Sequence, residues 1–452
     1  MSETVAVSWH PGPLWRHREF LLLWGGQTVS EIGSQMTVLA LPLVAVVLLH
    51  ASTLEVGLLS AAQTSAYLLV SLPAGALVGR FGERRIMLWS DVARLVLIGS
   101  VPVAAALGAL GLAQLYAVAL VSSAVSVFFS VAYPSYLPTL LTRDQLVDGN
   151  GKLGTTQSLA QIAGPGFGAG LVAAFGAASA MTADALSYLV SAGSLLAIST
   201  PDALARARPR PDSAPQAQAQ SQSQSEPGRR PRLREEIRAG LAYVAHEPIL
   251  LKGALWSGCA NFFVVMVESL GTVFLVRTLH VRAEYVGLLL ALGAVGGVAG
   301  GLAAGGLARR LGSARVCRLS MTLFSLPGLV IPAAGSGGRV LLFAVGWMSW
   351  TFAATVCTVG LLSYRQATCP PELLARVNAT SRWINWGTLP LGGLAAGALG
   401  SSLGVRPTLW IAVIGGCASG LWLQFSPLRR MRDFPYPQGQ DSDVSTRSRS
   451  SA

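Results

Sequence analysis

Three carboxylic acids interrupt otherwise apolar stretches of this sequence: Glu31, Asp184 and Glu268. An ionised acid at the centre of a bilayer costs roughly 2.5 to 3.5 kcal/mol, so such residues usually face a cavity or a partner. Burial favours the protonated form of a carboxyl group, which suits it to taking up and releasing a proton. Glu31 and Glu268 fall in equivalent spans of the two halves and could face one central cavity from opposite sides, so we expect at least one of them to carry protons, with Asp184 as a further candidate. The alternatives are binding of a cationic substrate and hydrogen bonding to neighbouring helices.

A second set of polar side chains falls inside apolar stretches and offers candidates for a ligand cavity. Aromatic and amide groups together suit an amphipathic or weakly cationic organic molecule. The alternative for each aromatic residue is simple packing or anchoring at the membrane interface. The candidates are Gln27, Gln35, Gln63, Gln157, Gln161, Asn261, Arg382, Asn385 and Trp386.

The elements that must position these residues are membrane-spanning helices. Hydrophobic residues make up 52% of the chain and charged residues only 12%, about half of the roughly 25% that is usual in soluble proteins. Apolar runs of about 20 residues are long enough to cross a bilayer as a helix. Six such runs precede residue 200: 19–48, 54–79, 86–110, 113–136, 152–175 and 177–199. Six more follow residue 248: 250–276, 284–308, 316–335, 338–363, 380–402 and 407–426.

Charge asymmetry predicts the orientation of these spans. With both termini in the cytoplasm, only Arg277, Arg282, Arg339 and Arg406 among the 33 Lys and Arg residues fall on the outer side. That bias follows the positive-inside rule. The net charge of +12 is therefore attributed to membrane topology, and no nucleic-acid partner is expected, because a nucleic-acid surface gathers its basic residues on one folded domain. We expect a multi-pass protein of the plasma membrane.

An internal repeat joins the two sets of spans. Segments that begin at Val56 and at Val286 share their spacing and end in the same glycine and arginine pattern, which indicates a parallel duplication. In the first copy Asp91 and Arg94 follow the turn and are candidate partners for its arginines. We expect the turn to act as a conformational latch, or only as an orientation signal. The pattern comprises Gly75, Arg80, Gly82, Arg84 and Arg85 in the first copy, and Gly305, Arg310 and Gly312 in the second.

Two glycine-rich segments indicate close helix packing. Gly164, Pro165 and Gly168 lie within the fifth predicted span, where proline frees a backbone carbonyl and small residues let a neighbour approach. This arrangement suits a rocking joint. In the eighth span glycines recur every four residues and a parallel row runs beside them, so we expect either a sliding or a static interface. The stripe is Gly293, Gly297, Gly301 and Gly305, and the parallel row is Gly296 and Gly300.

The sequence thus predicts an all-α polytopic membrane protein with twelve transmembrane helices in two pseudo-symmetric six-helix bundles. The bundles occupy residues 1–200 and 249–427. Between them, 201–232 is rich in Pro, Ala, Gln and Ser and is expected to be a flexible cytoplasmic linker. Residues 233–248 have the spacing of an amphipathic interfacial helix, and 428–452 are expected to form a disordered cytoplasmic tail.

The turn and the proline segment resemble signatures of the major facilitator superfamily, and within it the twelve-helix multidrug and siderophore exporter branch. The resemblance covers almost the whole chain. Gly79 stands where the family turn usually has Asp, and Ala169 replaces the last Gly of the family's helix-five motif. The resemblance implies alternating access, with the turn as a latch between halves. It also implies export by antiport, which the helix-five motif accompanies.

Other classes of activity find little support in the sequence. Neither Lys152 nor Lys252 is followed by Ser or Thr, so there is no phosphate-binding loop and we expect no bound ATP. The histidines show no metal-binding spacing, and no cofactor or enzymatic activity is expected. We expect a secondary transporter that exports a drug, siderophore or other secondary metabolite in exchange for protons. The alternatives are a uniporter or importer of the same fold and, from another class, a membrane receptor or scaffold that moves nothing.

Overall fold

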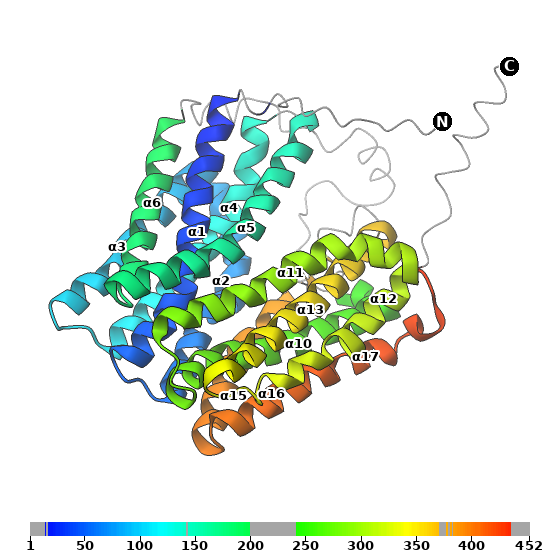
Figure 1. Ribbon diagram of the computed structural model, residues 1–452. Coiled ribbons are helices and arrows are strands. Elements are labelled where there is room, and N and C mark those ends of the chain that lie inside the picture. The colour runs from blue at the N-terminus through cyan, green and yellow to red at the C-terminus, as the bar shows by residue number, and fades with distance from the viewer. Residues whose placement is uncertain are drawn as a thin grey trace, which may run out of the picture. The chain divides into compact units, whose positions relative to one another are not determined.

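The computed structural model describes residues 14, 17–141, 143–198, 241–369, 377, 380–381 and 383–434. Within these ranges the regular elements are helices, and no strand occurs (Figure 1). Seven of the described helices are long and apolar enough to cross a membrane. Each of the twelve predicted spans overlaps at least one helix. The predicted class, an all-α polytopic membrane protein, is confirmed.

The described residues between 17 and 198 form six long helices. Their bounds are α1 Arg18–Val47, α2 Thr53–Phe81, α3 Glu83–Ala106, α4 Leu112–Leu140, α5 Arg143–Phe175 and α6 Ser179–Ala197. Local sequence signals set several of these ends. Ser52 and Glu55 form a capping box, in which the Ser52 Oγ accepts from the Glu55 amide at 3.3 Å and the Glu55 carboxylate accepts from the Ser52 amide at 2.6 Å. Gly82 separates α2 from α3 with φ of 90°, a conformation that favours glycine.

The C-terminal part is less regular. It contains α10 Pro248–Val273, α11 Ala283–Leu311, α12 Ser313–Leu319, α13 Leu341–Thr368, α15 Leu389–Ser402, α16 Val405–Ser419 and α17 Leu421–Gln424. Shorter helices are the π-helices η2 Phe274–Thr278 and η3 Ser320–Phe324, and the 3-10 helices η4 Leu326–Val330, η5 Gly337–Val340 and η6 Pro427–Arg430. The predicted span 316–335 is therefore three short helices in sequence. Pro327 lies at the start of η4, where its missing amide donor leaves no helical hydrogen bond unmade.

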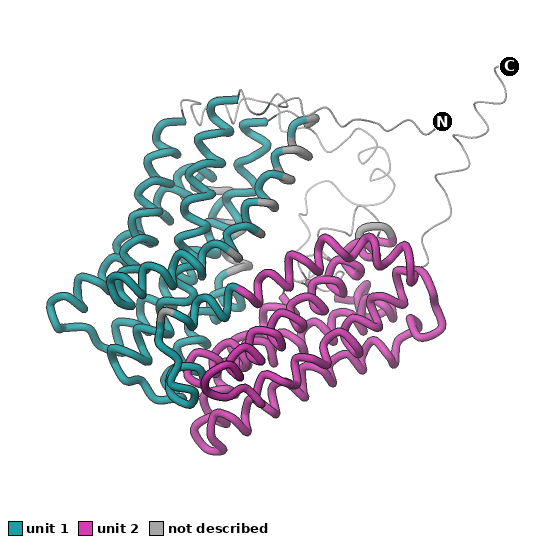
Figure 2. The backbone as a smooth tube through the Cα atoms, in the orientation of Figure 1, with its two compact units in different colours: residues 1–229, 275–291 teal, residues 230–274, 292–452 magenta. Residues whose placement is uncertain are grey.

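Contacts divide the chain into two units (Figure 2). One comprises residues 1–229 and 275–291, and the other comprises 230–274 and 292–452. The predicted linker 201–232 and most of the predicted tail lie outside the described residues. Of the predicted interfacial helix 233–248, residues 241–246 are helical and 233–240 are not described.

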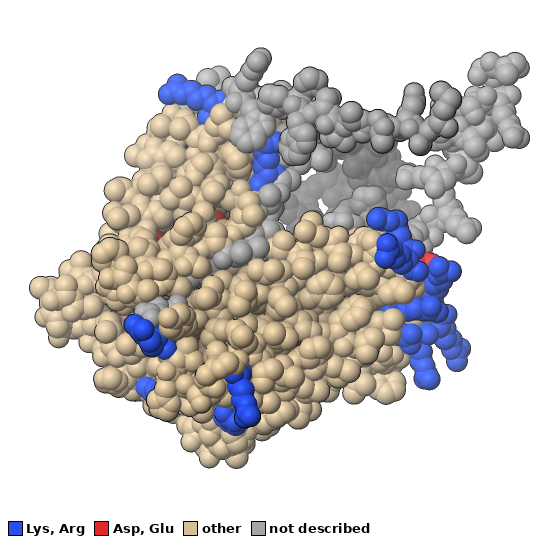
Figure 3. Space-filling model, viewed as in Figure 1, with Lys and Arg blue, Asp and Glu red and all other residues tan. Residues whose placement is uncertain are grey.

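Each unit has its own pattern of helix packing. In the first, α1 contacts α5 and α6, α2 contacts α4, and α3 contacts both α4 and α6. In the second, α10 contacts α15 and α16, and α13 contacts α12 and η4. On the face shown in Figure 3, most of the surface carries neither acidic nor basic side chains, and Lys and Arg gather near helix ends. This distribution is typical of helices that pass through a bilayer.

Candidate functional site

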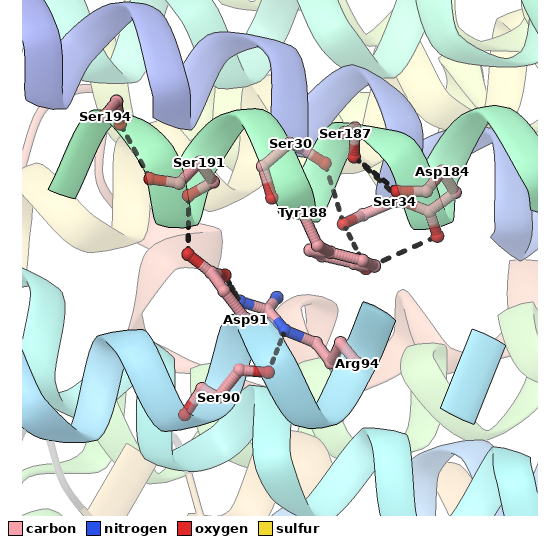
Figure 4. A network of polar contacts seen from close by, with 10 residues as sticks. All are labelled: Ser30, Ser34, Ser90, Asp91, Arg94, Asp184, Ser187, Tyr188, Ser191 and Ser194. Atoms are coloured by element: carbon pink, nitrogen blue, oxygen red, sulfur yellow. Dashed lines mark hydrogen bonds and ion pairs between the residues drawn. The ribbon is translucent and has the colours of Figure 1, made fainter. Parts of the chain in front are cut away.

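A buried polar network lies inside the first unit, between α1, α3 and α6 (Figure 4). Asp91 and Arg94 are three residues apart on α3, so both side chains lie on one face of that helix. The Arg94 Nη2 donates to Asp91 Oδ1 at 2.6 Å, and both side chains are buried. On α6, the Ser191 hydroxyl donates to the other carboxylate oxygen of Asp91 at 2.7 Å. The Asp91 carboxylate therefore neutralises Arg94 and ties α3 to α6.

Aromatic rings hold the guanidinium of Arg94 from two sides. Its Cζ lies 4.5 Å from the centre of the Phe129 ring on α4 and 4.4 Å from that of Tyr188 on α6. Cation–π contacts of this kind are worth about 2 kcal/mol when desolvated. Together with the Asp91 pair, they fix the position of the one guanidinium in this network.

Asp184, on α6, is fully buried and has partners of a different kind. Its carboxylate accepts hydrogen bonds from the hydroxyls of Thr37 at 2.5 Å, Ser187 at 3.3 Å and Tyr188 at 3.3 Å. The described residues place no Lys or Arg nitrogen in a salt bridge with it. With both carboxylates and Arg94 ionised, the network would carry a net charge of −1.

Glycines on α1 allow α6 to come close enough for these bonds. A Cβ at Gly33 would lie 2.7 Å from Asp184 Oδ1, and one at Gly26 would lie 2.9 Å from the Ser194 Cβ. Both distances are shorter than real Cβ contacts, so a larger residue at either position would push α1 and α6 apart. The hydroxyl of Ser34 contacts that of Tyr188 at 2.9 Å and completes the link between the two helices.

The three predicted acids have different surroundings. Asp184 lies in the network just described. Glu31, half-buried on α1, accepts a hydrogen bond from Gln35 Nε2 at 3.4 Å. Glu268 is exposed on α10 of the second unit, and the described part of the chain gives it no hydrogen bond or ion pair.

The polar cavity candidates are dispersed. Gln27, Gln35 and Gln63 are half-buried, whereas Gln157 and Gln161 are exposed on α5. In the second unit, Asn261 donates to the backbone carbonyl of Asn385 at 3.1 Å, and Trp386 is half-buried. Arg382 lies outside the described residues. Among the described cavity candidates, Asn261 and Asn385 are thus the two that are joined by a hydrogen bond.

The residues of the basic turn make contacts within the first unit. The Arg84 Nη2 donates to the carbonyls of Leu195 at 2.9 Å and Ile198 at 2.8 Å, at the C-terminal end of α6. Positive charge is favourable there because helix C-termini expose unpaired carbonyls. Arg85 is exposed. Gly75 and Arg80 lie in α2, and their side-chain surroundings are not described.

The corresponding turn in the second unit is held by a segment near the C-terminus. Gly312, with φ of 95°, separates α11 from α12. Asp433 Oδ1 accepts from the Ser313 amide at 2.9 Å, and the carbonyl of Arg432 accepts from the next two amides at 3.1 Å. Orphan amides at the start of α12 are therefore paired by residues more than a hundred positions away. Gly305 and Arg310 are exposed on α11.

The predicted joint on α5 packs against α1. A Cβ at Gly164 would lie 3.0 Å from the carbonyl of Ile32, and one at Gly168 would lie 3.4 Å from Met36. The side-chain surroundings of Pro165 are not described. Close approach is thus present at this place, as the small residues predicted.

Sequence reasoning did not single out Phe129, Tyr188 or the hydroxyl-bearing partners of Asp184. One signal was available: Ser30 and Ser34 on α1, and Ser187 and Ser191 on α6, recur at four-residue spacing inside apolar helices. Such rows of small polar residues are typical of interhelical hydrogen bonding in membranes.

Comparisons with known proteins agree with this architecture. The family model of the Major Facilitator Superfamily matches residues 23–386. An uncharacterized MFS-type transporter of Bacillus subtilis (strain 168), YfiS, is 26% identical over 268 residues, which span 59% of this chain and 58% of that relative.

Solved structures of transporters share the fold. A variant of the nucleoside transporter NupG aligns with a TM-score of 0.70 at 10% identity, covering 90% of this chain and 99% of that one. A bacterial homologue of the iron transporter ferroportin aligns with a TM-score of 0.65 at 16% identity, covering 91% and 98%. At these identities the likeness concerns the fold alone. With the match to the family model over most of its length, this chain belongs to the Major Facilitator Superfamily and is a multi-pass membrane protein.

Proposed function

We propose that this transporter exports a small organic compound in exchange for protons, and that Asp184 carries the proton. The observation that supports this most is the unequal pairing of the two buried carboxylates. Asp91 has Arg94 as its counter-ion, whereas Asp184 is held by three neutral hydroxyls.

The protonation state of Asp184 bears directly on helix packing. An ionised acid without a cation costs roughly 3 kcal/mol inside a bilayer, and protonation removes most of that cost. The Tyr188 hydroxyl bonds to Asp184 while its ring contacts Arg94. Loss of the proton therefore favours a shift of Arg94, or of α6 against α1, toward the uncompensated charge. A group whose two protonation states favour different packing can couple proton movement to a conformational change.

Glu31 and Glu268 are further candidates for the same role. Glu268 is exposed along an apolar helix, where an ionised side chain would need water or a cationic ligand beside it. Glu31 is on the same helix as Thr37, a partner of Asp184.

Two features of the sequence support export and a plasma-membrane location. The helix-five segment resembles that of exporting antiporters, and the distribution of Lys and Arg favours a plasma-membrane protein with both termini in the cytoplasm. The substrate class is a drug, siderophore or other secondary metabolite, moved without bound ATP. Uniport or import by the same fold, and a receptor that moves nothing, are the competing functions.

Proteoliposomes that contain a pH-sensitive dye test the proton carrier. Wild type, Asp184→Asn, Glu31→Gln and Glu268→Gln are challenged with a panel of amphipathic drugs and siderophores. We expect substrate-driven proton flux in wild type and at least about a tenfold loss in Asp184→Asn, because the amide keeps the shape of the carboxyl group but binds no proton. Exchange of labelled for unlabelled substrate should persist in this variant, which separates lost coupling from misfolding.

The other outcomes discriminate between the alternatives. Flux that persists in Asp184→Asn and disappears in Glu31→Gln or Glu268→Gln would move the carrier to that residue. Substrate movement without proton flux in wild type would refute antiport and leave uniport. No movement of any compound on the panel would favour the receptor.

A further inference from the structure

A group of basic side chains, called here the cation cluster, surrounds α17 and η6 in the second unit. Figure 3 shows Lys and Arg side chains gathered at the end of this unit that holds α12. The cluster comprises Lys252 on α10, Arg318 on α12, and Arg429 and Arg430 on η6. The helix α17 packs against α10 and η6, and η6 also packs against α12. Segments that are distant in sequence therefore bring four positive charges to the surroundings of α17.

The two half-buried cations of the cluster contact α17 through neutral groups. Lys252 Nζ lies 5.0 Å from the centre of the Trp422 ring. Arg318 Nη1 donates to Gln424 Oε1 at 3.3 Å, and Gln424 Nε2 donates to the Thr322 hydroxyl at 3.2 Å. An aromatic ring and an amide hold these charges in place without cancelling them, so both cations still attract an anion.

Two acids close in sequence to the cluster are engaged with other groups. Glu247 accepts from the Tyr364 hydroxyl at 2.8 Å. Asp433 accepts from the Ser313 amide at 2.9 Å, and its other oxygen lies 4.0 Å from Arg432 Nε. Among the described residues, none of the four cations of the cluster forms an ion pair. Their charges are therefore not compensated by this part of the chain.

Exposed aromatic rings accompany these charges. Trp422 is 39% exposed and Phe425 is 73% exposed, and both precede the exposed Arg429 and Arg430 in the chain. Aromatic rings are enriched where the acyl region of a membrane meets the headgroups. Cations beside such rings can contact lipid phosphates while the rings contact acyl chains. The surroundings of α17 thus combine the two surfaces that a charged lipid needs.

We propose that the cation cluster binds an anionic phospholipid, with the phosphate at the cations and the acyl chains along α17. The unpaired charges favour this occupant over a zwitterionic lipid. The exposed rings of Trp422 and Phe425 favour it over a free phosphate ion, which gains nothing from an apolar surface. The site lies outside the buried network of the first unit and is independent of the function proposed above.

Native mass spectrometry of the purified full chain in a neutral detergent tests the site. Dioleoyl phosphatidylglycerol is titrated in parallel with dioleoyl phosphatidylcholine, which has the same acyl chains but no net charge. We expect the anionic lipid to bind at least about tenfold more tightly. A Lys or Arg near an anionic lipid contributes about fivefold, so Lys252→Gln and Arg429→Gln should each weaken binding by about that factor, and Arg429→Gln/Arg430→Gln by about 25-fold.

Arg339→Gln is the matched control for Arg429→Gln. Arg339 is also exposed, but it lies in η5, which the predicted topology places on the outer side. Its replacement should leave the affinity for phosphatidylglycerol close to that of wild type. Equal affinity for the two lipids would overturn the proposal, because acyl chains alone would then explain binding. Equal losses in Arg339→Gln and Arg429→Gln would overturn it in favour of attraction to the overall charge. Displacement of the lipid by an equal concentration of sodium phosphate would overturn it in favour of a free anion.

Discussion

Replacement of Gly300 by alanine tests how closely α11 packs against α13. A Cβ at Gly300 would lie 2.6 Å from the carbonyl oxygen of Phe352, whereas ordinary van der Waals contact begins at 3.4 Å. Relief therefore requires a shift of about 0.8 Å, the difference between the two distances. Because the opposing atom belongs to the backbone, no side-chain rotation can supply this shift, and the two helices must separate.

The loss of stability depends on which contacts between α11 and α13 the separation would disturb. Overpacking of a tight interface costs about 1 to 3 kcal/mol. The same seam includes Gly296, where a Cβ would overlap the carbonyl of Met348, and a hydrogen bond of 2.6 Å from the Thr351 hydroxyl to the carbonyl of Gly293. We expect Gly300→Ala to cost about 2 kcal/mol, which lowers the melting temperature by about 4 to 8 °C for a unit of this size.

The assay is the apparent melting temperature of the detergent-solubilised protein, followed by size-exclusion chromatography after heating. Gly301→Ala is the control on the adjacent residue, because its Cβ would have no atom closer than 3.9 Å. It should melt between the wild-type temperature and about 4 °C above it, since alanine in place of glycine favours the helix by up to about 1 kcal/mol and makes no close contact here. Equal melting temperatures for the two variants would refute the placement of the seam.

Two further predictions concern the basic turns. Arg84→Gln should lower stability by about 1 to 2 kcal/mol, because it removes the charged donor from the carbonyls of Leu195 and Ile198; an unchanged melting temperature would contradict this role. Asp433→Ala should cost about 1 kcal/mol by leaving the Ser313 amide unpaired. Asp433→Asn keeps an acceptor and should melt close to wild type, so similar losses in both Asp433 variants would indicate that charge, not capping, matters there.

The helices could be predicted because the bilayer imposes their length and composition. Each predicted span overlaps a helix, but the bounds differ where local chemistry decides them. The third span was predicted to begin at residue 86, whereas α3 begins at Glu83. A span predicted from hydropathy leaves out Glu83 and Arg84 because their side chains are charged. The backbone turns at Gly82, where φ is positive, and the helix begins at the next residue.

The close-packed glycine row was predicted less well. The four-residue stripe was the more regular pattern, but the tightest approaches to α13 occur at Gly293, Gly296 and Gly300. At Gly297 and Gly301 a Cβ would make ordinary contacts. In a membrane helix the lipid-facing and protein-facing sides are both apolar, so periodicity alone does not fix the rotation of the helix about its axis.

The sequence by itself predicted an all-α polytopic membrane protein with two related halves, and it singled out Asp184, Asp91 and Arg94 as unusual residues. Only the tertiary structure decided that Arg94 pairs with Asp91, whereas the partners of Asp184 are hydroxyls. The physical reason is that these partners come from different helices, and their distances depend on how closely α1 and α6 approach. Composition determines that a helix can cross the bilayer, whereas packing between helices determines which of its charged side chains have a counter-ion.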